Sequence, residues 1–193
     1  MGMENGEPGT GAASETIYTL GHSNRDLEPF VALLEEADIG ALADIRTYPS
    51  SRRFPWFNEG NLADSLEERG IRYRHIDALG GLRDEPEPDG TIEGVPEKWK
   101  PYAAHMQTGE FAKGIEALID LVDRHGPAAY MCAERDPRQC HRQFVSDVLA
   151  LQGWEVVHLI RGGESRVHEV RTDARETEDG RVVYPSEQRE LPL

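Results

Sequence analysis

The densest group of reactive side chains in the sequence lies between residues 131 and 142. This segment holds both cysteines of the chain, Cys132 and Cys140, together with Glu134 and Arg142. A thiolate can act as a nucleophile, a carboxylate can exchange protons, and a guanidinium can hold an anion. The segment is therefore the first candidate for a functional site.

Further groups with chemistry follow two apolar runs earlier in the chain. His22 and Ser23 follow the first run, and Asp44 and Arg46 close the second. In an open parallel sheet, ligands bind in a crevice outside the carboxyl ends of the strands. We therefore expect these four side chains to face the cysteine-containing segment.

The leading hypothesis is an enzyme that uses acid–base chemistry on a phosphorylated or otherwise anionic substrate, such as a nucleotide or a nucleic-acid end. Its catalytic residues are expected to be Glu134, Asp44, His22 and Cys132. Its anion-binding residues are expected to be Ser23, Arg46, Arg138, His141 and Arg142. A structural ion pair is an equally good interpretation of Asp44 and Arg46. A non-catalytic binding module would use the same pocket.

Thiol or sulfur-transfer chemistry, with Cys132 as the nucleophile, is an alternative function. Cys132 and Arg138 match the Cys-x5-Arg spacing of cysteine phosphatases, and rhodanese-type sulfurtransferases use a related cysteine loop. However, Glu134 and Asp136 would repel a bound phosphate, and Pro137 would remove an amide donor, so the match is weak evidence. Asp136 and Pro137 instead predict the cap and first residue of a helix.

No cofactor is predicted, and zinc is an alternative that the residue types leave open. Cys132, Cys140 and His141 are all of the types that bind zinc, but Cys-x7-Cys-His is not a recognised zinc spacing. Cys140 also shares an apolar helical stripe with Phe144 and Val148, which favours a small buried hydrophobe.

Alternating strand and helix patterns from residue 16 to 160 predict a single α/β domain. Strands are expected at 17–20, 41–46, 71–76, 128–131 and 156–160. Helices are expected at 27–34, 62–66, 99–106, 111–122 and 144–151. This order predicts a mostly parallel five-stranded sheet with helices on both faces, as in Rossmann-like folds.

The two ends of the chain have different compositions from the domain between them. Residues 1–15 contain almost no large apolar side chain and are expected to be a disordered leader. Residues 161–193 are charged and poor in apolar side chains. They are expected either to form a hairpin from 167–170 and 181–184 or to be disordered.

The chain is strongly acidic, with a net charge of −15, and its lysines are limited to Lys98, Lys100 and Lys113. Nucleic-acid binding needs cationic surface, so it is expected only at a local patch where Arg52 and Arg53 neighbour aromatic residues. The composition suits a chain that stays soluble at high salt, which predicts a halophilic source. No apolar run or signal-peptide pattern suggests a membrane or secreted protein, so a cytoplasmic protein with reduced thiols is expected.

Several ordered motifs resemble the family called domain of unknown function 488. The resemblance rests on residues 19–23, 44–46, 48–50, 79–81, 102, 106, 111, 131–134, 137, 140–142 and 158, and more weakly on 168 and 184–185. It covers residues 16–160 and continues more weakly into the C-terminal extension. It implies a compact, intracellular, prokaryotic α/β domain, and it implies no particular reaction.

Overall fold

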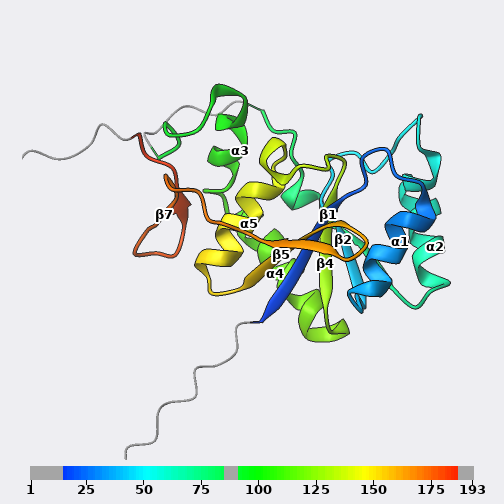
Figure 1. Cartoon of the computed structure of the whole chain (residues 1–193). Helices are drawn as coiled ribbons and strands as arrows, with labels where there is room; N and C mark the ends of the chain where they lie inside the picture. The colour runs from blue at the N-terminus through cyan, green and yellow to red at the C-terminus, as the bar shows by residue number, and fades with distance from the viewer. Residues whose placement is uncertain (1–14, 85–90, 187–193) are drawn as a thin grey trace, which may run out of the picture.

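The structure is a computed structural model that describes residues 15–84 and 91–186 (Figure 1). Residues 1–14 of the expected leader, and the last residues of the C-terminal extension, lie outside the described part of the chain. None of the helices in the described residues has the length and apolar character that a membrane crossing needs.

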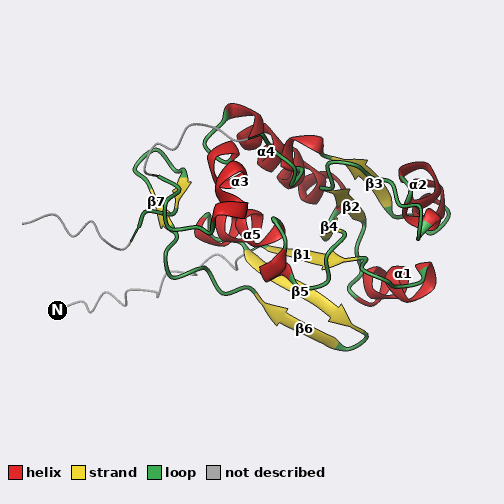
Figure 2. Ribbon diagram, turned by 90° about the horizontal axis from the view of Figure 1, so that it is seen from above, coloured by secondary structure: helices red, strands yellow, loops and turns green. Residues whose placement is uncertain are grey.

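The centre of the molecule is a six-stranded sheet with the order β3-β2-β4-β1-β5-β6. The strands are β1 (Thr16–Gly21), β2 (Ala41–Asp44), β3 (Arg72–His75), β4 (Ala128–Cys132), β5 (Glu155–Arg161) and β6 (Glu164–Val167). All neighbours are parallel except β5 and β6. The prediction of a mostly parallel α/β sheet is confirmed. The sixth strand, at the edge in Figure 2, was missed because all its residues are exposed and show no apolar alternation.

Helices cover both faces of the sheet, as predicted. One face carries α1 (Leu27–Glu36) and α2 (Glu59–Glu67), whose apolar stripes bury residues such as Phe30, Leu34 and Leu62. The other face carries α3 (Lys100–His105), α4 (Gly109–His125) and α5 (Arg142–Leu151). In Figure 1 the two groups of helices lie on opposite sides of the strands.

The start of α5 differs from the prediction. Asp136 does act as a cap, since its side chain accepts a hydrogen bond from the Arg138 amide, but the turn that it begins is a short 3-10 helix, η4 (Pro137–Gln139). Cys140 then adopts an extended conformation, with φ −137° and ψ 153°, so the α-helix begins only at Arg142. Asp and Pro are typical of any helical start, and they do not specify how long the helix continues.

Part of the C-terminal extension forms an antiparallel hairpin of β7 (Arg175–Glu176) and β8 (Val182–Val183). The second predicted hairpin strand is thus confirmed in position, whereas the first lies later than predicted. The reason is that Val167 belongs to β6, where it pairs with Val157 of the main sheet. The hairpin is anchored to the domain by the Tyr184 hydroxyl, which donates to Asp147 over 2.9 Å.

The fold places a crevice at the carboxyl ends of the central strands. β1 and β4 are neighbours, and Gly21 pairs with Cys132 at their ends. The helices that follow them, α1 and α5, pack on opposite faces, so the chain continues to opposite sides of the sheet after these two strands. Such a switch point is where open α/β sheets bind ligands.

Candidate functional site

A pocket of about 300 Å³ lies in this crevice. Its walls come from the loops after β1, β2 and β4, from the segment after β3 and from the start of α5. The lining residues are His22, Arg46, Thr47, Tyr48, Ser50, Ser51, Gly81, Cys132, Ala133, Glu134, Cys140 and His141. The groups predicted from three separate strand ends therefore meet in one place.

Both cysteines line the pocket as a pair of free thiols. Cys132 ends β4 and Cys140 precedes α5, and their side chains hydrogen-bond to each other. They are 1% and 3% exposed. The backbone N–H of Glu134 also donates to the Cys132 sulfur over 3.3 Å. The loop thus directs donors at a sulfur that has been removed from bulk water.

Arg142 is buried directly behind the thiols and is 1% exposed. Its Nε donates to Cys132 Sγ over 3.0 Å, and its Nη1 donates to Thr19 Oγ1 over 3.0 Å. Its Nη2 donates to the carbonyl oxygens of Glu134 and Arg135. No carboxylate of the described residues contacts this guanidinium. Since a buried charge needs a counter-charge, the thiol pair is the natural partner.

Ionisation of the two thiols is coupled. Burial raises the pKa of Cys132 well above the ordinary cysteine value, and its hydrogen bond to Cys140 acts in the same direction. Burial also opposes ionisation of Cys140, but the hydrogen bond from Cys132 and the nearby Arg142 outweigh it and lower the pKa of Cys140. The opposite shifts favour ionisation of Cys140 ahead of Cys132, so the two thiols lose their protons in separate steps.

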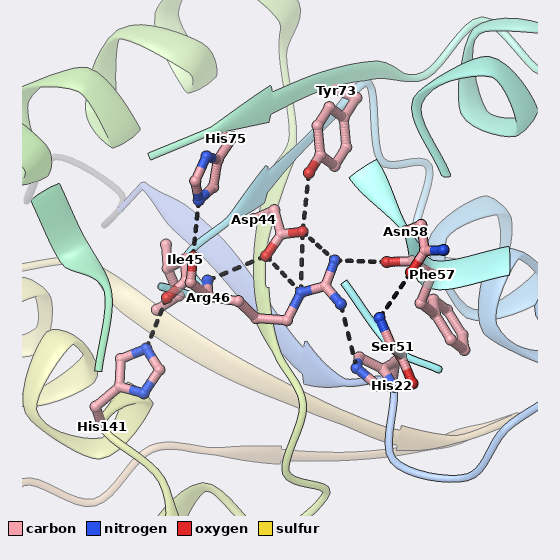
Figure 3. Close-up of polar contacts among 10 residues, drawn as sticks. All are labelled: His22, Asp44, Ile45, Arg46, Ser51, Phe57, Asn58, Tyr73, His75 and His141. Carbon is pink, nitrogen blue, oxygen red and sulfur yellow. Dashed lines mark hydrogen bonds and ion pairs between the residues drawn. The ribbon is translucent and has the colours of Figure 1, made fainter. Parts of the chain in front are cut away.

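His141 is placed to exchange a proton with this pair. Its Nε2 donates to the carbonyl oxygen of Ile45 over 2.8 Å, as Figure 3 shows, so Nδ1 of the neutral ring carries a lone pair. That Nδ1 lies 3.4 Å from Cys140 Sγ. Burial lowers the pKa of His141, which keeps the ring neutral. Gly81 packs so closely that a Cβ there would lie 2.4 Å from Nδ1.

Asp44 and Arg46 form a buried ion pair beside the pocket (Figure 3). Arg46 Nε lies 2.9 Å and 3.0 Å from the two carboxylate oxygens, and the Tyr73 hydroxyl donates to the same carboxylate over 2.9 Å. Arg46 also donates to the carbonyl oxygen of Phe57 over 2.8 Å. Asp44 is fully buried and does not line the pocket. This arrangement fits the structural-ion-pair interpretation better than a catalytic carboxylate.

His22 lies against the same ion pair. Its ring stacks on Phe57 at a centroid distance of 4.3 Å, and its Nδ1 donates to the Ser23 carbonyl over 2.9 Å. Burial, and then the charge of Arg46, lower the pKa of His22 to about 4, so the ring is neutral at pH 7. Ser23 itself is not a lining residue, and its hydroxyl points to Asn24.

Two other predicted site residues, Glu134 and Arg138, form no side-chain hydrogen bond or ion pair with the described residues that line this pocket. Glu134 lines the pocket with an exposed side chain, and within the described part of the chain its carboxylate has no hydrogen bond or ion pair. Arg138 is 74% exposed, pairs with Asp136 over 2.9 Å and lies outside this pocket. The loop therefore lacks the arginine that a Cys-x5-Arg phosphatase needs over its cysteine.

The described residues contain no group of three or more histidine, cysteine, aspartate or glutamate side chains that could hold a metal ion. Cys132, Cys140 and His141 are neighbours, but the imidazole Nε2 is already committed to a carbonyl oxygen. These residues thus do not form the four-ligand arrangement that a structural zinc site requires.

Two supporting residues were not predicted. Thr19 receives a hydrogen bond from Arg142, and Tyr73 completes the partners of Asp44. A signal existed for Thr19, because it is a polar residue inside an apolar strand and so needs a buried partner. Tyr73 gave no such signal, because it lies in an alternating strand where an aromatic residue is ordinary.

Fold and site together define an α/β protein with a paired-thiol pocket at its topological switch point. Over residues 26–149 the chain matches the family described as Domain of unknown function DUF488. This match spans more than half of the sequence, and the chain belongs to that family. Comparison with curated proteins finds no match, and comparison with solved structures finds none either.

Proposed function

We propose that this protein is a thiol-dependent enzyme whose Cys132–Cys140 pair exchanges electrons with small disulfides. The observation that carries the proposal is the buried Arg142 guanidinium, whose nearest ionisable partner is the thiol pair. A fixed cation beside a cysteine favours the thiolate, which is the nucleophilic form. The second thiol, in hydrogen-bond contact, is placed to resolve an intermediate.

The proposed reaction proceeds in two balanced steps. The thiolate of the pair attacks one sulfur of a substrate disulfide, so that a protein–substrate disulfide forms and a substrate thiolate leaves. The second protein thiol then gives up its proton and attacks the protein-side sulfur. A Cys132–Cys140 disulfide forms, and the second substrate thiolate leaves. The substrate gains two electrons and the cysteines lose two, while the one remaining thiol proton passes to one product thiolate and the other product takes its proton from solvent.

His141 and Arg142 have separate roles in this scheme. The lone pair on His141 Nδ1, 3.4 Å from Cys140 Sγ, can accept the Cys140 proton when that thiol ionises. Arg142 stabilises the thiolate before attack and cannot itself lose its proton under ordinary conditions. Both are held by carbonyl oxygens, which fixes their geometry before substrate enters.

The pocket sets the size of the substrate. A volume of about 300 Å³ lies at the lower end for small-molecule sites, so a macromolecular disulfide would not fit inside. The walls offer hydroxyl groups from Ser50 and Ser51, and Tyr48, which is 69% exposed, can cover a bound molecule. These features favour a small disulfide.

Acid–base chemistry on an anionic substrate receives less support from this arrangement. Asp44 has its acceptor positions occupied by Arg46 and Tyr73, and Glu134 lacks the burial that would adapt a carboxylate to proton transfer near pH 7. That hypothesis stays a prediction, to be tested by turnover of phosphate esters in a Glu134→Gln variant.

The test uses the reduced full-length protein and hydroxyethyl disulfide, with free thiol release and protein mass as readouts. We expect two product thiols per protein and a Cys132–Cys140 disulfide. Cys132→Ser and Cys140→Ser should each stop at one product thiol or none, with a trapped mixed disulfide in the variant that keeps the attacking sulfur. Arg138→Gln, an exposed control, should behave as the unaltered protein. The proposal fails if the unaltered protein releases no thiol.

A further inference from the structure

A second pocket, of about 350 Å³, lies between the start of α5, β5, β6 and the segment after β6. It shares no lining residue with the thiol pocket. Its lining combines three arginines with two histidines, which is unusual in a chain of net charge −15. These side chains are Arg138, Arg166, Arg171, His158 and His168.

The two histidines form a chain of hydrogen bonds that ends on a buried carboxylate. His158 Nε2 lies 3.0 Å from His168 Nδ1, and His168 Nε2 lies 2.8 Å from Asp147 Oδ1. Asp147 is fully buried and also accepts from the Arg171 backbone N–H and the Tyr184 hydroxyl. Since the Arg171 N–H and the Tyr184 hydroxyl both donate to Asp147, this carboxylate acts as the acceptor of the cluster, and His168 donates to it from Nε2.

This polarity leaves an unused acceptor on His158. With Nε2 of His168 donating to Asp147, its Nδ1 accepts from His158 Nε2, and Nδ1 of His158 keeps a lone pair. His158 is 3% exposed, and its Nδ1 has no hydrogen-bond partner among the described residues. Buried polar atoms are almost always paired, and an unpaired nitrogen on a residue that lines a pocket needs an explanation. A ligand that brings a hydroxyl donor would supply the missing partner.

The arginines of this pocket are held in place for binding an oxyanion. Arg138 forms a two-point contact with Asp136 over 3.1 Å and 2.9 Å, and Arg171 forms one with Asp173 over 3.0 Å and 2.6 Å. These carboxylates offset charge but also orient the planar groups. Arg171 Nη1 also donates to Gln143 Oε1 over 3.3 Å, and each of the two guanidinium groups keeps N–H donors that these contacts do not use. Arg166 is exposed and has no ion pair within the described residues. Guanidinium groups bind phosphate by paired hydrogen bonds.

The carboxylate of Glu169 also borders the pocket. It would repel a bare anion, but it can accept a hydrogen bond from a ligand hydroxyl, as can His158 Nδ1. The pocket thus offers donors for a phosphate and acceptors for hydroxyls. Its volume lies at the lower end for small-molecule sites.

We propose that this second pocket binds a small phosphate monoester of a polyhydroxylated carbon skeleton. Arg166, with Arg138 and Arg171, holds the phosphate, and His158 accepts from a hydroxyl. Sugar phosphates and nucleoside monophosphates both carry this chemistry. The site is independent of the thiol pair, so binding here stands or fails separately from disulfide reduction.

The test is titration calorimetry on the full-length protein with ribose 5-phosphate, adenosine 5′-monophosphate, inorganic phosphate and ribose as probes. We expect one or both esters to bind more tightly than phosphate, and ribose not to bind. Tighter binding of the nucleotide than of ribose 5-phosphate would assign the site to nucleotides, and the reverse order to sugar phosphates. Binding of neither ester overturns the proposal.

Two variants locate the binding. Arg166→Gln should weaken ester binding about tenfold, as expected for the loss of a charge-assisted hydrogen bond. Arg124→Gln, which removes an exposed arginine of α4 outside the pocket, should leave affinity unchanged. His158→Gln should weaken the ester while sparing inorganic phosphate. Equal affinity in the Arg166 and Arg124 variants would contradict the assignment, even if the His158 variant failed to fold.

Discussion

The Nε atom of Arg142 lies 3.0 Å from Sγ of Cys132, and no carboxylate in the described part of the chain contacts this guanidinium. Arginine and cysteine are ten residues apart in sequence, and the strand-loop-helix turn brings them together. An unpaired buried guanidinium would be strongly destabilising, whereas a thiolate partner balances it. The same contact therefore contributes to folding and sets the reactivity of the pocket.

Replacing Arg142 should change both the stability of the fold and the reactivity of the thiols. Arg142→Met removes the counter-charge, so we expect alkylation of the thiols by iodoacetamide to need a higher pH than in the unaltered protein. Arg142→Lys keeps a charge but loses the planar donors to two carbonyl oxygens, and it should give an intermediate result. The readout is the alkylation rate against pH, followed by mass spectrometry. Equal profiles for the Met variant and the unaltered protein would argue against the thiolate role.

The buried ion pair should be a major source of stability. Asp44→Asn leaves the Arg46 guanidinium buried without a carboxylate, which we expect to cost about 3–5 kcal/mol of unfolding free energy. Tyr73→Phe removes one hydrogen bond to a charged group and should cost about 1.5–3 kcal/mol.

The control for these variants is the exposed Asp120–Arg124 pair of α4. Asp120→Asn should cost about 0.5 kcal/mol or less, because water screens exposed ion pairs. Urea unfolding followed by circular dichroism measures the unfolding free energy of the Asp44, Tyr73 and Asp120 variants. If Asp44→Asn cost no more than Asp120→Asn, the ion pair would not hold the pocket wall as described.

Stability should fall in mild acid. Burial lowers the pKa of His22 to about 4 and that of His158 to about 3, while an unfolded histidine titrates near 6.5. Between these pH values the histidines bind protons in the unfolded chain but not in the folded chain, so the free energy of unfolding rises with pH. The contribution is complete above about pH 6.5 and is lost as pH falls toward 4, with a slope of at most about 1.4 kcal/mol per pH unit for each histidine.

The measurement is the urea midpoint between pH 5 and 7. His22→Gln should make the urea midpoint depend less on pH, because the variant lacks one of the histidines whose pKa is lowered by folding. His125→Gln changes an exposed histidine at the end of α4 and should leave the slope unaltered. A slope that is the same in the His22 variant and the unaltered protein would contradict the assignment.

The loops after β1 and β4 lie so close together at the crevice that position 21 should have no room for a side chain. A Cβ on Gly21 would lie 1.7 Å from the Glu134 carbonyl oxygen, so Gly21→Ala must displace the loop that follows Cys132. We expect marked destabilisation and loss of thiol reactivity. Gly60→Ala, where a Cβ meets no atom within 4 Å, should instead stabilise α2 by about 0.5–1 kcal/mol. Equal thermal unfolding of the two variants would contradict this geometry.

Local sequence patterns were sufficient to predict the layers of the fold. Apolar runs and amphipathic stripes identified the five parallel strands and the helices, because burial imposes the periodicity that the sequence displays. The exposed β6 strand and the short β7 strand lack that signal, since backbone pairing at a sheet edge leaves little trace in residue type. Strand order also depends on long-range pairing that the local pattern does not encode.

The sequence indicated which residues would lie near one another in the site, but not which contacts they would make. Strand ends indicated that His22, Arg46 and Cys132 would meet. Contact geometry alone revealed that Asp44 is fully occupied by its neighbours and that Arg142 faces a thiol in place of an external anion. Arg138 shows the same limit, because its pairing with Asp136 turns it toward a different pocket.

The central claim is that the thiol pair carries one negative charge in the folded protein. Titration of thiolate ultraviolet absorbance in the reduced protein tests it most directly, with Cys132→Ser and Cys140→Ser for assignment. We predict that one thiolate per chain forms with a midpoint below about 8.5, the value for a free cysteine, and that the second forms only well above it. Absence of any thiolate below about pH 8.5 in the folded protein would contradict the account.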